Sequence, residues 1–469
     1  MENKNISRRE FLKKMGLGVA ATSAVAAACS DKKSENNSAI EIPKGKMTYR
    51  QNPKTKEKVS LLGYGMMRLP VVATNDDKNN GSARESDAPI DQEMVNKLVD
   101  FAIEHGVNYF DTSPAYCKGQ SEKATGIALS RHKRNEYFIA TKLSNFAPET
   151  WKYNTSVQMF QNSLKELQVD YVDYLLLHGV GMGSGMEEYK ARYVNNGVLD
   201  YLLGQREKGI IRNLGFSFHG DVAVFDYLLS MHDKYKWDFV QIQMNYMDWH
   251  YAKQINSRNV NAEYLYGELS KRNIPVVIME PLLGGRLVKM PDAIVKQMKQ
   301  REPEYSVASW ALRFLGTFDG VMTCLSGMTE MSHLQDNLRT LCPLKPLNNE
   351  EMNFLYSIAK TMVEMNTIPC NECQYCMPCP YGLDIPSIFT HYNRCIVEGN
   401  ISQSTADENY KKARRAFLIG YDRKVPKLRQ ANMCTSCGEC ISHCPQRIAI
   451  PSELQRIDQY VEKIKQNTL

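Results

Sequence analysis

The chain has 469 residues and a formal net charge of +6, with 43% hydrophobic and 23% charged residues. This length allows two or three domains, and the balance of apolar and charged residues excludes a disordered or collagen-like chain. A net charge this small argues against nucleic-acid binding, because proteins that bind nucleic acids usually carry a basic stripe. Of the 13 cysteines, nine lie between residues 370 and 444. Disulfide frameworks belong to small secreted domains, so this crowding favours metal or cluster ligands.

The N-terminus, residues 1–28, has the composition of an export signal. Arg8 and Arg9 precede Phe11-Leu12-Lys13, and an uncharged, mildly apolar run from residue 15 ends in small residues. The run is too short to span a bilayer of roughly 30 Å as a helix. The paired arginines resemble a twin-arginine signal, which implies export of an already folded protein. We therefore expect a bacterial periplasmic protein or membrane-anchored lipoprotein.

Cys29 lies where a lipoprotein signal places its acylated cysteine, directly after Ala27 and Ala28. Ala26 departs from that pattern, because a larger aliphatic residue is usual there. Residues 29–46 are largely polar after the cysteine and are interpreted as a flexible tether. Two outcomes stay open, namely membrane attachment through a lipidated Cys29 and plain cleavage that releases a soluble exported protein.

The middle of the chain, residues 47–345, alternates β-rich runs with helix-compatible segments. The expected strands are 59–63, 109–112, 137–141, 171–177, 212–217, 239–244, 275–279 and 320–325. The expected helices are 91–105, 121–131, 155–167, 196–208, 222–230, 262–272, 306–315 and 331–341. Eight such pairs predict an α/β fold, a (β/α)8 TIM barrel, with a doubly wound sheet as the alternative. Residues 71–90 and 179–195 are expected to be inserted loops.

Four polar side chains fall at the ends of three successive predicted strands, where a barrel places its chemistry. They are Asp111, Tyr116, Lys142 and His178. A free tyrosine has a pKa near 10, and a neighbouring ammonium favours the phenolate. Asp111 would hold Lys142 in place, His178 would orient a carbonyl oxygen, and Tyr116 would protonate that oxygen as a hydride arrives. Each residue alone is more often structural, and only the combination favours catalysis.

This part of the chain resembles the aldo/keto reductase family. The resemblance rests on the segments Gly63–Leu69, Phe110–Tyr116, Ala140–Lys142, Asp173–His178 and Gly215–Ser217, in the order and spacing of the family. It implies a TIM barrel, nicotinamide-dependent carbonyl chemistry and a small-molecule carbonyl or alcohol substrate. The catalytic tetrad of the family carries over as the four residues named above.

The resemblance also implies a cofactor site, which the sequence matches less completely. The positions that carry over to it are Ser217, Gln241, Leu282, Gly284, Arg286, Gly327, His333 and Asn337. Ser217 and Gln241 would hold the nicotinamide amide, and the segment with Arg286 would cover the pyrophosphate. Phe218 replaces the usual asparagine, and Met279 replaces a stacking aromatic residue. The choice between NADP and NAD stays open.

Two cysteine runs lie in the C-terminal part, residues 346–469. They are Cys370-x2-Cys373-x2-Cys376-x2-Cys379-Pro and Cys434-x2-Cys437-x2-Cys440-x3-Cys444-Pro. The second has the spacing of a bacterial ferredoxin, in which three cysteines bind one 4Fe–4S cluster and the fourth binds another. The reciprocal arrangement gives Cys379 to the second run's cluster and Cys444 to the first run's. Zinc is the alternative.

The segment between the two runs, 386–431, is helix-compatible, so we expect a mainly α-helical, two-cluster ferredoxin-like domain. Cys395 within it is expected to pack rather than ligate. Cys117, Cys324 and Cys342 in the barrel are expected to be buried or incidental thiols, although Cys117 adjoins Tyr116.

Three functions fit this sequence. The first is an exported oxidoreductase whose two 4Fe–4S clusters connect the barrel to a redox partner protein or a quinone. The second is an electron-transfer subunit whose barrel is mainly a scaffold, for which the substitutions Phe218 and Met279 argue. In the third, the clusters are only structural.

Overall fold

The computed structural model describes residues 42–72, 82–83, 88–255, 259–365, 367–370, 372, 374–444, 446 and 448–469. The predicted signal, Cys29, Cys373 and part of the expected loop 71–90 lie outside these residues. In the part of the chain that the structure describes, no helix has the length and apolar character needed to cross a membrane.

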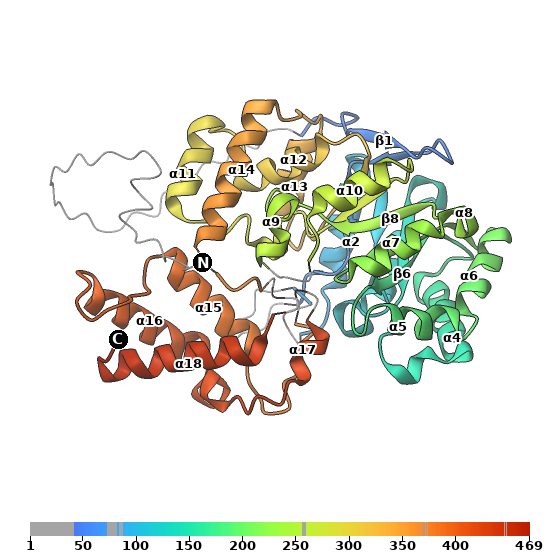
Figure 1. Cartoon of the computed structure of the whole chain (residues 1–469). Helices are drawn as coiled ribbons and strands as arrows, with labels where there is room; N and C mark the ends of the chain where they lie inside the picture. Colours follow the sequence, from blue (N-terminus) through green and yellow to red (C-terminus); the bar gives the residue numbers. More distant parts are fainter. Residues whose placement is uncertain are drawn as a thin grey trace.

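Eight parallel strands close into a barrel, which confirms the predicted fold (Figure 1). The strands are β3 Leu62–Gly65, β4 Tyr109–Asp111, β5 Phe138–Leu143, β6 Val172–Val180, β7 Ile211–Phe218, β8 Phe239–Gln243, β9 Val276–Met279 and β10 Val321–Ser326. Each pairs with the next along the chain, and β10 pairs with β3. All nine residues of β6 are buried, because helices cover a parallel barrel from outside while side chains fill it from within.

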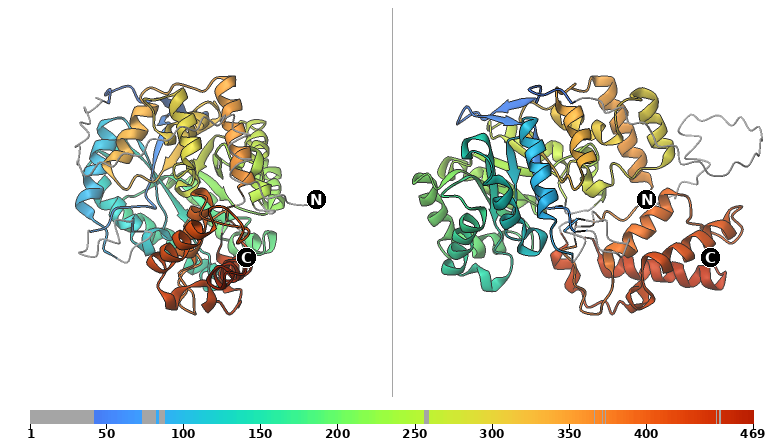
Figure 2. Two further views of the ribbon diagram at one scale, coloured as in Figure 1. Left: turned by 90° about the vertical axis from the view of Figure 1, so that its left-hand side faces the viewer. Right: turned by 180° about the vertical axis from the view of Figure 1, so that it is seen from behind.

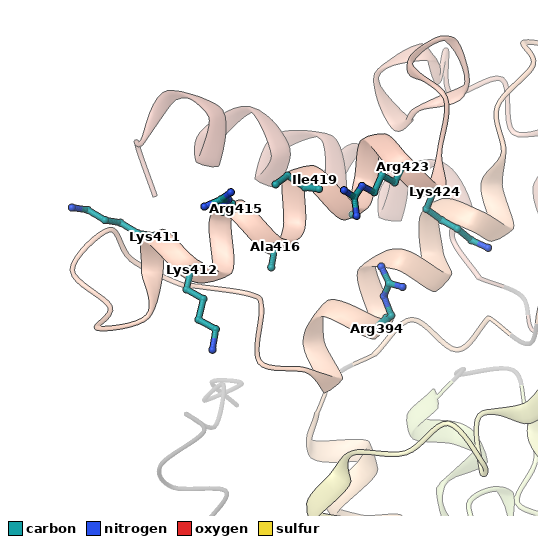
Figure 3. A pocket seen from close by; sticks show the side chains of 9 residues that line it. Arg394, Lys411, Lys412, Arg415, Ala416, Ile419, Arg423 and Lys424 are labelled. Carbon is teal, nitrogen blue, oxygen red and sulfur yellow. The ribbon is translucent and has the colours of Figure 1, made fainter. Parts of the chain in front are cut away.

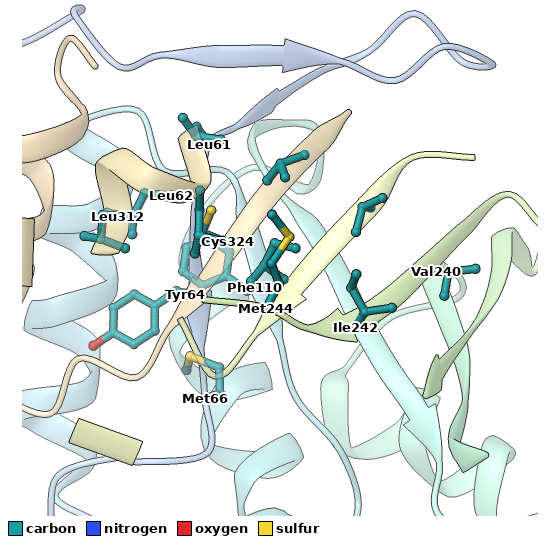
Figure 4. Close-up of a cluster of buried hydrophobic side chains, with 14 of the residues drawn as sticks. Leu61, Leu62, Tyr64, Met66, Phe110, Val240, Ile242, Met244, Leu312 and Cys324 are labelled. Atoms are coloured by element: carbon teal, nitrogen blue, oxygen red, sulfur yellow. The ribbon is translucent and has the colours of Figure 1, made fainter. Parts of the chain in front are cut away.

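Eight helices follow the eight strands and cover the barrel. They are α2 Gln92–Glu104, α3 Ser121–Leu129, α4 Tyr153–Leu167, α6 Val198–Glu207, α7 Val222–Ser230, α10 Ala262–Ser270, α12 Val307–Gly316 and α13 Met331–Leu341. The large core lies between strands and helices. Figure 4 shows Tyr64 and Phe110 in this layer, with ring centroids 6.0 Å apart, and Leu312 of α12 nearby.

The first predicted strand, 59–63, is divided in the structure. Lys58–Ser60 forms β2 and pairs antiparallel with β1, Tyr49–Gln51, whereas the barrel strand begins only at Leu62. The hairpin reaches the lower barrel interior, where Asn52 donates a hydrogen bond of 3.2 Å to the Tyr174 hydroxyl. The two strands are separated by a bend at Leu61, where the chain changes direction.

Several elements differ from the expected loops and lengths. The expected loop 179–195 contains α5, Met186–Tyr189, followed by one π-helical stretch over Lys190–Val194. Three further helices were not predicted: α8 His232–Tyr235, α9 Asp248–Ile255 and α11 Asp292–Arg301. They lie in the connections after β7, β8 and β9.

The helix α14, Asn349–Glu364, belongs to the packing of the barrel. Its buried face, which includes Phe354, Leu355 and Ile358, joins the large barrel core. A capping box at Asn348 and Glu351 fixes its start, and Glu351 also pairs with the buried Arg313 of α12 at 2.7 Å. The barrel unit therefore extends past the predicted boundary at residue 345.

The C-terminal region has its own helical core and lies against one end of the barrel (Figures 1 and 2). Its helices are α15 Ile385–Val397, α16 Tyr410–Lys424, α17 Glu439–His443 and α18 Ile450–Gln466. The helix-compatible stretch 386–431 is thus two helices, α15 and α16, joined by a loop. Cys395 is buried in this core, as expected, and burial raises its pKa to about 12.

Candidate active site and cluster domain

Three of the four predicted catalytic side chains stand on neighbouring strands. Asp111 ends β4, Lys142 lies near the end of β5, and His178 lies in β6. Tyr116 begins the short 3-10 turn Tyr116–Gly119 in the loop after β4. Because carboxyl ends of parallel strands meet at one end of a barrel, the order of the strands brings all four side chains together.

A buried ion pair joins Lys142 to Asp111. The Lys142 Nζ atom lies 2.5 Å from Asp111 Oδ1 and donates a second hydrogen bond, of 2.9 Å, to the carbonyl oxygen of Thr112. Both side chains are almost completely buried. Burial raises the pKa of Asp111, and the neighbouring ammonium of Lys142 acts in the opposite direction. The pair fixes the ammonium beneath the ring of Tyr116.

Tyr116 lies where its hydroxyl group can meet a substrate. Its side chain is half-buried, its ring centroid is 4.7 Å from Lys142 Nζ, and its ring meets that of His178 edge-on at 5.8 Å. The next two residues, Cys117 and Lys118, have left-handed backbone angles, with φ of 49° and 54°. Such angles cost free energy in residues other than glycine and are found at functional sites. Cys117 itself is buried, as expected.

His178 is held as a neutral imidazole. Burial lowers its pKa well below the ordinary value, and the positive charges of Lys142 and Arg192 lower it further. The ring atom Nδ1 lies 2.6 Å from Ser144 Oγ, and the ring of Phe146 packs beside it at 4.8 Å. A neutral ring held in this way can donate one hydrogen bond to a substrate oxygen.

Ser217 and Gln241 lie beside the tetrad on adjacent strands. They face each other in the register of β7 and β8, and Ser217 Oγ accepts a 2.8 Å hydrogen bond from the backbone of Gly179, next to His178. Gln241 Oε1 is buried and has no hydrogen-bond partner among the described residues. A buried acceptor without a partner is costly, so this atom fits the amide of a nicotinamide.

The other predicted cofactor positions, away from the nicotinamide amide, lie in the loops and helix that follow β9 and β10. Leu282 and Gly284 lie in the turn after β9, and Gly327 and His333 are exposed. Asn337 donates a 2.9 Å hydrogen bond to Ser326 Oγ within the protein.

Two substitutions of the family pattern lie close to these positions. Phe218, in place of asparagine, is buried against Phe225 with ring centroids 5.0 Å apart. Met279, in place of an aromatic residue, ends β9 and is partly exposed. Phe218 thus contributes to the core rather than to a polar contact.

Arg286 points to the C-terminal region instead of lying free in the barrel mouth. Its guanidinium donates a 2.9 Å hydrogen bond to Thr367 Oγ1, three residues before Cys370. Burial lowers the pKa of Arg286, whereas the charges of Asp248 and of Cys370 raise it. Its Nη1 atom is buried and has no hydrogen-bond partner among the described residues. The predicted pyrophosphate contact is therefore also a contact to the first cysteine run.

Four cysteines from both runs gather at one cavity of the C-terminal region. Cys379 lines it together with Cys434, Cys437 and Cys440, beside Leu454 of α18. The pKa of Cys440 rises to about 11, first through burial and then through the charges of the other three thiols. This grouping of Cys379 with the second run is the reciprocal arrangement that the sequence predicted, and the thiols fit an iron–sulfur cluster.

The other four predicted cluster ligands are Cys370, Cys373, Cys376 and Cys444. Cys370 and Cys376 are partly exposed, Cys444 is buried, and Cys373 lies outside the described residues. Among the described residues, no three His, Cys, Asp or Glu side chains are already close enough to hold a metal ion. Gln446, two residues after Cys444, donates a 3.2 Å hydrogen bond to Gln243 Oε1 at the end of β8. The first run and Cys444 thus lie toward the barrel mouth.

Comparison with known proteins identifies both parts of the chain. Residues 61–360 match the aldo/keto reductase family, and residues 369–450 match a 4Fe-4S dicluster domain. The chain belongs to the aldo/keto reductase family. It is similar to an uncharacterized oxidoreductase of Bacillus subtilis, which is 24% identical over 291 residues that cover 56% of this chain and 87% of that protein.

Solved structures share the fold of the barrel. An aldo-keto reductase from Bacillus halodurans in its holo form has a TM-score of 0.52 and is 21% identical, covering 67% of this chain and 97% of its own. An aldo-keto reductase from Klebsiella pneumoniae in complex with NADPH has a TM-score of 0.50 and is 20% identical, covering 66% of this chain and 96% of its own. These likenesses show that the barrel has the same fold.

Sequence reasoning missed the residues that hold the histidine of this aldo/keto reductase. Ser144 binds the His178 ring, and Arg192 donates a 2.6 Å hydrogen bond to the His178 carbonyl oxygen. Ser144 follows Lys142 by two residues, and the two-residue period of a strand could have placed it on the same side. Arg192 lies in the π-helical stretch that was expected to be a loop, so no pattern marked it.

Glu122 of α3 is a second buried carboxyl near the tetrad of this aldo/keto reductase. Thr141 Oγ1 donates a 2.5 Å hydrogen bond to it, and burial raises its pKa to about 7. An unfolded glutamate titrates near 4.3, so between about pH 4.5 and 7 only the unfolded state loses its proton. The free energy of unfolding should therefore fall by up to about 3 kcal/mol as pH rises through this window.

Glu122→Gln should remove this contribution, because a neutral amide does not titrate. Urea unfolding of the wild type and the variant at about pH 5 and about pH 8 measures the difference in pH dependence. The exposed Glu149→Gln serves as the matched control and should leave the dependence unchanged. An equal pH dependence in wild type and Glu122→Gln would contradict the assignment.

Proposed function

We propose that this chain is an exported oxidoreductase that transfers a hydride between a nicotinamide, NADP or NAD, and a carbonyl or alcohol substrate. The clusters of its C-terminal domain, two of the 4Fe–4S type, exchange single electrons with a redox partner protein or a quinone. The observation that carries the proposal is the half-buried Tyr116 above the buried pair of Lys142 and Asp111, next to a neutral His178.

The residues act together as a proton donor to the carbonyl oxygen. A bound nicotinamide supplies the hydride to the carbonyl carbon and is itself oxidised. Neutral His178 donates a hydrogen bond that orients the oxygen, and Tyr116 gives that oxygen its phenolic proton, which completes an alcohol. The ammonium of Lys142, 4.7 Å from the Tyr116 ring centroid, stabilises the phenolate left behind. Asp111 holds that ammonium in place. Alcohol oxidation follows the reverse path.

Nicotinamide binding is supported at its amide end. Ser217 and Gln241 lie beside the tetrad, and the buried Gln241 Oε1 has no partner among the described residues. The similar protein from Klebsiella pneumoniae is in complex with NADPH. Export is supported by the Arg8-Arg9 pair and the apolar run after it, and attachment through a lipidated Cys29 belongs to the same proposal. No nucleic-acid partner is proposed.

A second candidate function is an electron-transfer subunit whose barrel is mainly a scaffold. The hydrogen bond from Arg286 to Thr367 and the burial of Phe218 favour it, because both side chains contact other parts of the protein at positions that the family uses for the cofactor. In this alternative the barrel positions the cluster domain and reduces no carbonyl.

Anaerobic stopped-flow absorbance of the full holoprotein separates these functions. With NADPH or NADH and an aldehyde substrate, we expect the nicotinamide to be oxidised. When the aldehyde is omitted, we expect a partial loss of the iron–sulfur absorbance. In Cys437→Ser, which still has the tetrad, nicotinamide oxidation should persist while the cluster signal falls. Clusters that stay oxidised when NADPH or NADH is added without the aldehyde would rule out a relay. Absence of nicotinamide binding would favour the scaffold.

A further inference from the structure

A strongly basic groove runs along the outer side of the cluster domain. It has a volume of about 870 Å³ and lies between α15 and α16. Six of its nine lining residues are cationic: Arg394, Lys411, Lys412, Arg415, Arg423 and Lys424. No carboxylate lines it, and neither the catalytic site nor the cluster cysteines use any of these side chains. Figure 3 shows Arg394 and Arg423 facing each other across the groove.

The charges in the groove are largely uncompensated within the protein. Among the described residues, Arg394 alone of the six forms an ion pair, with Nε 3.8 Å from Glu398 Oε1. The other five cations form no ion pair with any residue in the described part of the chain. The net charge of the whole chain is only +6. This local excess is therefore a property of the groove, and it creates a positive potential that attracts an anionic partner.

Five of the cations stand on α16, at positions 411, 412, 415, 423 and 424. Lys411 and Arg415 are four residues apart and Lys412 and Arg415 are three apart, so like charges stand side by side. Such pairs destabilise a helix by about 0.2–0.5 kcal/mol each. An arrangement that costs stability is explained if a partner neutralises the charges.

The shape of the groove favours a protein over a lipid surface. Its floor is formed by Ala416, Ile419 and Gly420, and of these only Ile419 is a large exposed apolar side chain. A helix that lies in a membrane interface needs a broad apolar face, which α16 does not have. A concave strip between two helices instead fits a protruding segment of another protein.

The two walls of the groove are held rigidly together. A Cβ atom on Gly420 would lie 2.6 Å from His391 Cε1, so only glycine allows α15 and α16 to approach this closely. His391 Nε2 also lies 3.0 Å from the carbonyl oxygen of Phe417. The cations are thus presented by a preformed surface, which lowers the entropic cost of binding.

The groove is connected to the second cysteine run by a short, bonded segment. Helix α16 ends at Lys424, and Cys434 follows only after residues 425–433. The Tyr421 hydroxyl accepts a 2.9 Å hydrogen bond from the backbone of Ala431, and Gln430 donates one of 3.0 Å to Asp422. A protein seated in the groove would therefore lie on the element that leads into the cluster ligands.

We propose that the basic groove between α15 and α16 is the docking site for an acidic electron-transfer protein. This inference rests on the proposed electron exchange by the cluster domain. The partner presents a row of carboxylates to the six cations and receives or delivers single electrons through the cluster domain. Recognition is electrostatic, so binding weakens as the salt concentration rises.

Fluorescence anisotropy of a labelled poly-glutamate peptide with the anaerobically purified full holoprotein tests the groove. The test variant is Lys411→Gln/Arg415→Gln/Arg423→Gln. The control, Lys296→Gln/Lys360→Gln/Lys463→Gln, removes the same charge from exposed sites elsewhere. We expect the groove variant to bind the peptide about tenfold more weakly and the control to stay within about twofold of the wild type. Circular dichroism and iron–sulfur absorbance check that both variants fold.

Two further titrations test whether the groove binds an anionic membrane or a nucleic acid instead. Vesicles of phosphatidylcholine and phosphatidylglycerol, and a single-stranded RNA oligonucleotide, are titrated with the same three proteins. Equal peptide binding by the groove variant and the control overturns the proposal. Stronger groove-dependent binding to vesicles or RNA than to the peptide overturns it in favour of those ligands. Reduction of the clusters by NADPH or NADH is measured in parallel, so that a failure of the proposed electron exchange is seen separately from a failure of docking.

Discussion

Tyr116→Phe is expected to lower the turnover number for carbonyl reduction by about 10²–10⁴-fold, the usual contribution of a positioned general acid. The variant lacks only the hydroxyl group, so the contact of its ring with His178 at 5.8 Å and with Lys142 at 4.7 Å remains. The fold and nicotinamide binding should therefore be unchanged. Steady-state kinetics with an aldehyde, together with nicotinamide binding by fluorescence, measures both quantities.

The matched control is Tyr153→Phe, at an exposed tyrosine at the start of α4. It removes the same atom from the surface of the barrel and should leave the turnover number within about twofold. A Tyr116→Phe enzyme with turnover close to that of the wild type would show that another group protonates the substrate. Loss of nicotinamide binding in the same variant would instead point to a cofactor role for the tyrosine.

The barrel and the tetrad could be predicted because each rests on local sequence. Strand runs such as 109–112 and 171–177 coincide closely with β4 and β6, since a buried parallel strand needs a continuous apolar segment. Asp111, Lys142 and His178 stand where those runs end, and the order of the strands alone makes them neighbours. The division of 59–63 was missed because the bend lies at Leu61, an apolar residue that is itself compatible with a strand.

The environment of the tetrad could be predicted only in part. Ser144 lies two residues after Lys142, directly after the end of β5, and could have been found. Arg192, in contrast, reaches His178 from a segment whose helical form no periodicity revealed. The swap of Cys379 to the second run followed from the spacing of ferredoxin ligands, and the shared cavity supports it. The grouping of Cys379 with the second run was thus predictable from the spacing of the cysteines.

Contacts between the two parts of the chain could not be predicted, because they join residues far apart in sequence by tertiary packing alone. Arg286 reaches Thr367, and Gln446 reaches Gln243. The resemblance to the aldo/keto reductase family implied that the segment with Arg286 covers the pyrophosphate. In this chain the same guanidinium lies between the barrel and the first cysteine run.

Arg286→Gln is expected to lower the reduction potential of the cluster that we propose for the first run. The guanidinium of Arg286 is buried close enough to Cys370 for the two charges to interact, and reduction adds a negative charge to a cluster. A unit charge roughly 10 Å away at an effective dielectric constant of about 20 contributes about 1.7 kcal/mol, or about 70 mV for one electron. Removing the charge therefore makes reduction harder by an amount of this order.

Redox titration of the full holoprotein, followed by electron paramagnetic resonance, measures this potential directly and does not depend on turnover. Arg286→Lys keeps the charge and should retain most of the potential. Lys289→Gln removes an exposed charge that lies 3.8 Å from Glu372, and solvent screening should keep its effect small. An unchanged potential in Arg286→Gln, or the same shift in both Arg286 variants, would exclude the charge as the cause. A shift confined to Arg286→Gln would identify this side chain as an electrostatic link from the barrel mouth to the clusters.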